Sequence, residues 1–324
     1  MIQIQTRWGG WIAAVGCVIL SLCAAGETIQ VMLDFQLNAN HLPLVVAVER
    51  ELFAAAGLDI ELLVPTSASD PAKLAAAGVV EIALTPQINY MIARDAGLPV
   101  TAVGALIAEP LGGLLTLEGQ GIASLSELAG GKIGYSLEPL EPILWRTMLE
   151  ASGVDPSTVD LVHVGMNTIA ALLTGQVDAI GAFRNVEVFH VEQRGFAPVF
   201  FPQEEYGVPQ TMEVIFIAGD RTIEEDMGAL SRFFTALREA MVWIQAVPGE
   251  AEALFFEAHP ELGTDVEHRS LLATLPLLSA DLRLGATDSW QVLQAYLAEH
   301  ELIELEGDDV VWFTERFLSD AAPR

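Results

Sequence analysis

The segment VMLDFQLNANHLPLVVAVERELFAAAGLDIEL, residues 31–62, places a strand, a polar turn, a helix and a second strand in close succession. Pro43 stands in the first turn of the expected helix, where proline is tolerated, and Gly57 stands where a helix ends. Residues 58–64 then read as the second strand. This order predicts a mainly parallel sheet with helices on both faces.

The same alternation of strands and helices continues along the chain. Two long apolar strands near residues 100–117 interrupt this alternation, which resumes over 124–194. Residues 222–303 then read as almost wholly helical. We therefore expect two α/β lobes joined by two crossover strands, with a ligand cleft between them. The expected division is a leader at 1–26, lobe I at 27–112 and 217–324, and lobe II at 113–216.

The N-terminus has the layout of a secretory signal peptide. Arg7 precedes an apolar stretch that ends at Cys23, and small residues follow up to Gly26. The stretch is shorter than the roughly 20 residues of a spanning helix. We expect cleavage near Glu27 and a periplasmic protein; a lipoprotein anchored at Cys23 is less favoured because Leu22 precedes it. Both cysteines lie in this leader, so disulfides and thiol chemistry are not expected in the mature chain.

The charge balance is strongly acidic, with 44 Asp and Glu against 15 Lys and Arg. Such a surface repels nucleic acid and anionic lipid, so neither is an expected partner. Histidines are scattered without metal-ligand spacing, and no phosphate-binding loop or nucleophile motif occurs. We expect no cofactor, no metal and no enzymatic activity.

Three motifs carry a family resemblance: the opening segment, LLTGQVDAIGAFRNVEVFHVEQRGF at 172–196, and EEYGVP at 204–209. They resemble bacterial solute-binding proteins that deliver the pyrimidine precursor of thiamine to ABC importers. The resemblance implies a type II periplasmic binding protein that closes by hinge motion. It also implies an aminopyrimidine ligand of the formylaminopyrimidine or hydroxymethylpyrimidine type, a membrane permease as partner, and a monomer.

An aminopyrimidine is flat and neutral, so its pocket should offer aromatic faces, a carboxylate and amides. The resemblance gives Glu187 as the hydrogen-bond acceptor, although a Glu at a helix N-terminus is also favoured by the helix dipole. Asn38 matches a ligand-binding asparagine or makes an Asx turn, and Asn185 is a ligand contact or an N-cap. His41 stays undecided between ligand contact and structure. The aromatic candidates are Phe35, Tyr90, Tyr135, Phe183 and Tyr206.

Two alternatives remain open. Arg184 could admit a sulfonate, nitrate or other small anion if it faces the cleft. The pyrimidine synthases of thiamine biosynthesis share the fold and resemble residues 82–91, but Thr85 and Asn89 stand here where those enzymes carry a pyridoxal-binding lysine and a reactive histidine. The synthase alternative is therefore the weaker one.

Overall fold

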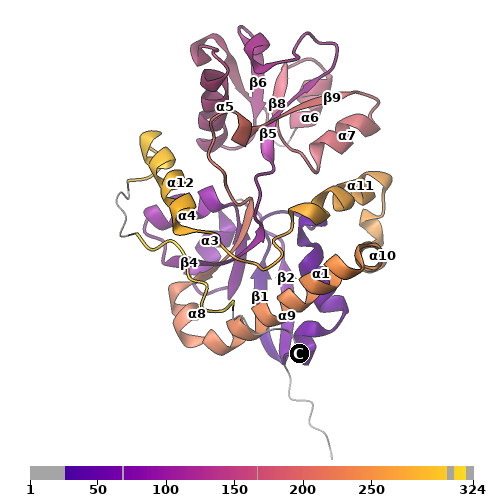
Figure 1. Cartoon of the computed structure of the whole chain (residues 1–324), viewed down its shortest axis with the longest axis vertical. Helices are drawn as coiled ribbons and strands as arrows, with labels where there is room; N and C mark the ends of the chain where they lie inside the picture. The colour runs from indigo at the N-terminus through magenta and orange to yellow at the C-terminus, as the bar shows by residue number, and fades with distance from the viewer. Residues whose placement is uncertain (1–25, 68, 166, 305–309, 319–324) are drawn as a thin grey trace, which may run out of the picture.

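The computed structural model describes residues 26–67, 69–165, 167–304 and 310–318. These form two α/β lobes stacked along the long axis of the molecule (Figure 1). The expected signal peptide, apart from Gly26, and both cysteines lie outside the described residues. Within the described ranges, no helix is both long and apolar enough to cross a membrane.

The sheet of lobe I has the strand order β2-β1-β3-β10-β4. Strand β1 runs parallel to β2 and β3, whereas β10 lies antiparallel between β3 and β4. The parallel β1–β2 pair is the one expected from the opening segment. The strands are β1 Glu27–Met32, β2 Leu58–Leu63, β3 Ile82–Thr85, β4 Val100–Ile107 and β10 Val214–Gly219.

The sheet of lobe II repeats this order as β7-β6-β8-β5-β9. Strand β6 runs parallel to β7 and β8, and β5 lies antiparallel between β8 and β9. Each sheet therefore contains one antiparallel strand next to its edge strand. The strands are β5 Gly112–Leu117, β6 Lys132–Tyr135, β7 Asp160–His163, β8 Ala179–Phe183 and β9 Pro198–Pro202.

Helices pack around both sheets, and most of them belong to lobe I (Figure 1). The helix expected over 43–56 is split in two, because Glu51 takes a left-handed backbone conformation with φ of 58°. In lobe I the helices are α1 Leu42–Glu49, α2 Leu52–Ala55, α3 Asp70–Ala76, α4 Gln87–Asp95, α8 Asp220–Glu225, α9 Met227–Ala246, α10 Pro248–Ala258, α11 Asp265–Thr274 and α12 Thr287–Glu299. In lobe II they are α5 Leu140–Ala151, α6 Thr168–Leu173 and α7 Glu187–Gln193.

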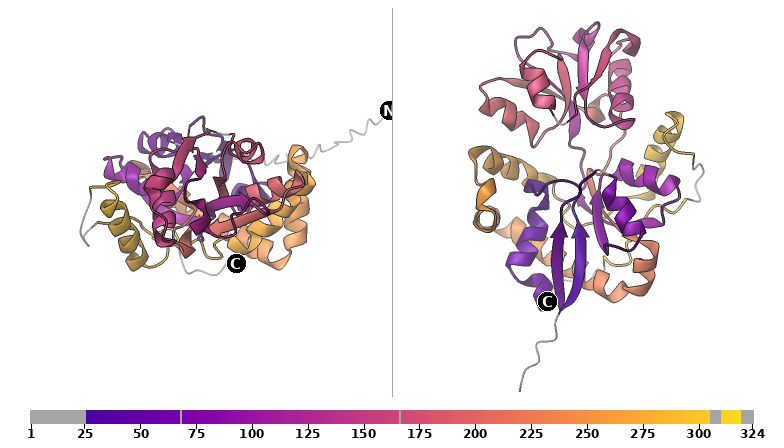
Figure 2. Two further views of the ribbon diagram at one scale, coloured as in Figure 1. Left: turned by 90° about the horizontal axis from the view of Figure 1, so that it is seen from above. Right: turned by 180° about the vertical axis from the view of Figure 1, so that it is seen from behind.

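Two connections join the lobes, residues 108–111 before β5 and residues 206–213 before β10 (Figures 1 and 2). Strand β10 belongs to lobe I because its residues pair with β3 and β4. It begins at Val214, which lies inside the range expected for lobe II. The two connections are bonded to each other, since the Leu111 N–H donates to Glu213 Oε2 over 3.0 Å.

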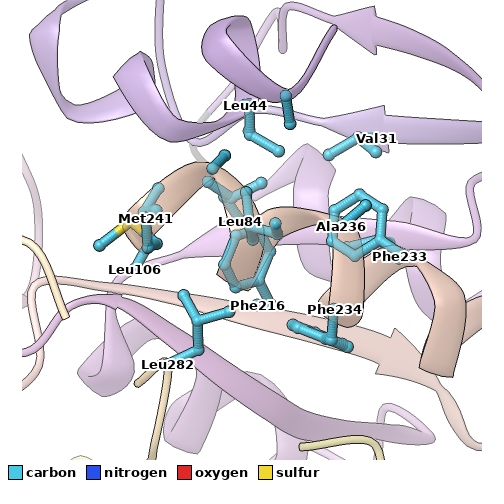
Figure 3. Close-up of a cluster of buried hydrophobic side chains, with 14 of the residues drawn as sticks. Val31, Leu44, Leu84, Leu106, Phe216, Phe233, Phe234, Ala236, Met241 and Leu282 are labelled. Atoms are coloured by element: carbon cyan, nitrogen blue, oxygen red, sulfur yellow. The ribbon is translucent and has the colours of Figure 1, made fainter. Parts of the chain in front are cut away.

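Phe216 of β10 lies at the centre of the lobe I core (Figure 3). Its ring lies edge-on to Phe233 and Phe234 of α9, with centroids 5.9 and 5.5 Å away. Aromatic residues bury large apolar areas and dominate the energetics of a core. The strand that returns from lobe II thus supplies a central side chain of lobe I.

Replacing Phe216 by alanine should lower the free energy of unfolding by about 3–5 kcal/mol, because a large cavity would remain in a closely packed core. Val292→Ala on the exposed face of α12 is the control and should change it by less than about 0.5 kcal/mol. Urea unfolding followed by circular dichroism measures both. Equal losses in the two variants would contradict the central position of Phe216.

Candidate functional site

A cleft lies between the two lobes and encloses about 600 Å³, including space open to solvent. Lobe I contributes the start of α4, and the second connection contributes its last residues. Lobe II contributes the first turns of α5, the loop before that helix and the end of β8. The lining residues are Pro86, Gln87, Ile88, Asn89, Gly112, Leu137, Leu140, Glu141, Leu144, Trp145, Ala182, Phe183, Gln203, Thr211, Met212 and Glu213.

The position of the cleft follows from the topology. Residues 86–89 follow β3, and Leu137 comes shortly after β6. Phe183 is the last residue of β8. The carboxyl ends of the parallel strands in both sheets therefore face this space, which is where α/β sheets bind ligands.

Glu141 and Trp145 lie one turn apart on α5 and line the lobe II wall. Glu141 Oε2 accepts a hydrogen bond of 2.7 Å from the Ser136 N–H, and burial raises the pKa of this carboxyl. Both side chains pack against Gly181 of β8, where an added Cβ would lie 2.6 Å from Trp145 Cζ2. Glycine at 181 thus allows the indole and the carboxyl to approach the strand.

Glu187 is a second partly buried carboxyl of lobe II, after Glu141. Its Oε2 accepts a hydrogen bond of 2.7 Å from the Phe183 N–H, so it is bonded to the backbone of a cleft-lining residue. Burial raises the pKa of Glu187, and the charge of Glu141 raises it further. Of these two carboxyls, Glu141 lines the cleft and Glu187 does not, and a carboxyl acceptor in the wall favours a ligand that donates N–H groups to it.

Glu213 places a second carboxyl in the cleft lining, and this one is buried at the junction of the two connections. Burial raises the pKa of Glu213 to about 7, against the opposing hydrogen bond from the Leu111 N–H, and the Asp34 charge raises it too. Its protonation therefore changes near neutral pH.

The pKa of Glu213 predicts a specific pH dependence of stability. Between its ordinary pKa of 4.5 and its folded pKa of about 7, the native state binds more protons than the unfolded state. This contribution to stability is therefore present at low pH and is lost as the pH rises through that window. Glu213→Gln keeps an acceptor for Leu111 and should raise the free energy of unfolding at pH 8 by up to about 3 kcal/mol, with little change at pH 4. Urea titrations at both pH values test this, and an equal change at both would contradict it.

The polar side chains of the opening turn bond mainly to one another. Asn38 Oδ1 accepts from the Asn40 N–H over 2.8 Å, and the Asn38 N–H donates to His41 Nδ1 over 3.1 Å. His41 is fully buried, and its Nε2 lies 2.8 Å from Asp34 Oδ1. Neither Asn38 nor His41 lines the cleft described above. Asn38 is the N-cap of the short helix of residues 39–41, a local backbone contact of the kind that the Asx-turn alternative describes.

Among the predicted aromatic residues, Phe183 lines the cleft and is 37% exposed. Tyr90 instead lies in the core, where its hydroxyl donates to the Trp312 carbonyl. The other three lie outside the lining: Phe35 is 49% exposed, the Tyr135 hydroxyl donates to Glu138, and Tyr206 packs edge-on against Phe201.

The sequence did not single out Glu141, Trp145 or Glu213. Glu141 and Trp145 are spaced four residues apart at the start of an expected helix that follows a strand. That spacing places both on one helix face and was the available signal. Glu213 directly precedes β10, and the sequence gives no sign that the two connections meet there.

Asn185 is neither an N-cap nor a residue of the cleft wall. The N-cap of α7 is Val186, and Asn185 Nδ2 donates to Asn40 Oδ1 over 2.8 Å and to Thr274 Oγ1 over 2.9 Å, both in lobe I. Arg184 forms an ion pair with Glu204 inside lobe II. The charge of Arg184 is thus compensated within its own lobe.

Two lobes of equal strand order, two connections and a cleft between them define the periplasmic binding protein fold. The periplasmic aliphatic sulphonate binding protein of Escherichia coli superposes with a TM-score of 0.69 at 14% identity, covering 89% of this chain and 92% of that one. At this identity the likeness shows the fold alone.

The chain belongs to the NMT1/THI5-like family, whose model matches residues 38–251. A Haemophilus influenzae protein named for thiamine biosynthesis is 37% identical, over 86% of this chain and 89% of the relative. The formylaminopyrimidine-binding protein of Halalkalibacterium halodurans is 34% identical, over 86% of this chain and 87% of the relative. A relative named as a pyrimidine phosphate synthase, from Legionella pneumophila, is more distant at 25% identity over 93% and 95%.

Proposed function

We propose that this protein is the extracytoplasmic solute-binding component of an ABC importer and that it binds a thiamine-precursor aminopyrimidine, of the formylaminopyrimidine type, in the interlobe cleft. It hands this ligand to a membrane permease. The likeness to a formylaminopyrimidine-binding protein supports the ligand class, and the two-lobed fold supports the binding role.

The observation that carries the proposal is the partly buried carboxyl of Glu141 in the lobe II wall, together with Glu187, which is bonded to the backbone of the cleft residue Phe183. An exocyclic amine supplies the N–H donors that such acceptors need once water is displaced. Phe183 offers a partly exposed ring next to them for stacking on a flat heterocycle.

The same wall disfavours an anionic ligand such as a sulfonate. Arg184 is the cation that could have attracted one, and its guanidinium is paired with Glu204. Buried carboxyls beside the space would repel a sulfonate or carboxylate group.

We also propose that the protein is not a pyrimidine synthase. Thr85 and Asn89 occupy the places of the synthase lysine and histidine named in the family resemblance. Thr85 is buried at the end of β3, and Asn89 lines the cleft as a neutral amide. Neither side chain can form an imine with pyridoxal phosphate.

Calorimetry with formylaminopyrimidine and with an alkanesulfonate tests the proposed function. We expect saturable 1:1 binding of the aminopyrimidine and none of the sulfonate. Native mass spectrometry of the protein as purified adds the mass of any retained ligand. Binding of the sulfonate in preference to the aminopyrimidine would overturn the proposal.

Glu141→Gln should weaken aminopyrimidine binding roughly 10-fold, because a charge-assisted hydrogen bond is replaced by a weaker neutral one. Glu150→Gln is the matched control, since Glu150 lies on the same helix and is exposed. Titration calorimetry of both variants gives the ratio. Equal affinities of the two variants would remove Glu141 from the site.

A further inference from the structure

A buried polar network joins the lobes beside the cleft. Asn185 of lobe II donates both of its amide hydrogens to lobe I, one to Asn40 Oδ1 at 2.8 Å and one to Thr274 Oγ1 at 2.9 Å. Asn185 is 1% exposed, Asn40 3% and Thr274 1%. Bonds this well shielded from water are the kind that hold two surfaces in one register.

Ser270 completes the network from the same helix as Thr274. Its hydroxyl donates to the Asn185 carbonyl over 2.6 Å, and the Thr274 hydroxyl donates to the Ser270 carbonyl over 2.8 Å. Both the side chain and the backbone of Asn185 are therefore held by α11. The turn after β8 cannot move away from lobe I without breaking three bonds to it.

The surface around this network is also paired between the lobes. Helices α7 and α11 lie side by side (Figure 1), with Arg269 of α11 bonded to Glu192 of α7 and lying 4.6 Å from the ring centre of Phe189. These groups are partly exposed, and exposed ion pairs contribute little. The buried amide network is the stronger part of the contact.

One feature keeps the network from locking the lobes permanently. Asn185 Oδ1 is buried without a hydrogen-bond partner among the described residues. An unpaired buried acceptor carries a penalty that is relieved when water reaches it, so opening the lobes recovers part of what the broken bonds lose. The free-energy difference between the bonded and the separated lobes is thereby reduced, so the contact can form and break.

We propose that Asn40, Asn185, Ser270 and Thr274 form an interlobe latch that holds the lobes together and thereby sets the rate at which a ligand leaves the cleft. None of the four lines the cleft, so they act as positioning residues. The latch depends on the two-lobed fold and not on the identity of the ligand.

Thr274→Val tests the latch because it removes the acceptor and keeps the shape of the side chain. Thr235→Val is the matched control: its hydroxyl also bonds to the carbonyl four residues earlier in a helix, over 2.8 Å, but on the exposed face of α9. Ser270→Ala is a second latch variant in case the valine variant does not fold. Stopped-flow kinetics with formylaminopyrimidine and small-angle scattering of the ligand-free proteins are the two measurements.

We expect the latch variants to raise the dissociation rate constant roughly 2- to 10-fold, the range for one hydrogen bond, with the association rate constant unchanged. Their ligand-free radius of gyration should exceed that of the wild type and of Thr235→Val. An unchanged radius of gyration in both latch variants would overturn the latch, as would an unchanged dissociation rate. If the wild type does not bind formylaminopyrimidine, the proposed function fails, and the scattering comparison still decides the latch.

Discussion

The fold depends on one topological constraint: each lobe is completed by the strand that enters it from the other lobe. β10 enters lobe I from lobe II and pairs with β3 and β4, which come earlier in the chain. β5 enters lobe II from lobe I and pairs with β8 and β9, which come later in the chain. The sheet of lobe I is therefore incomplete until the chain has returned. The cleft lies between the two lobes, which are joined by two connections. The hydrogen bond from Leu111 to Glu213 joins these connections to each other.

Three of the acidic residues that the structure describes, at or next to the cleft, have a pKa that burial raises. A net charge of −29 makes an exposed Glu unremarkable, because water solvates it. Glu141, Glu187 and Glu213 are different, since burial raises the pKa of each one. Groups that are costly to bury persist where they have a use. Glu141 and Glu213 line the cleft, which fits a site that accepts hydrogen bonds from its ligand.

Strand–helix alternation let the sequence predict most of the fold, because local periodicity and helix-ending glycines are local signals. It missed β9, whose sequence PVFFP is short and has proline at both ends. Such a segment forms a strand only at the edge of a sheet, here beside β5. That pairing depends on the tertiary structure and leaves no local signal in the sequence. It also missed the break at Glu51, because the left-handed residue there is not a glycine.

The site was harder to predict because polar residues at strand ends serve several purposes. Asn38 and His41 carry the family motif, yet their hydrogen bonds build the short helix of residues 39–41. That helix fixes the backbone of Asn40, whose side-chain oxygen then meets Asn185 from a position 145 residues away in the chain. The Asn40 N–H bonds to Asn38 within the turn, but the Asn40 side chain belongs to the interface between the lobes. The opening turn thus acts on the cleft through backbone geometry: it presents Asn40 to lobe II, and the two lobes meet at a side chain that the turn holds in place.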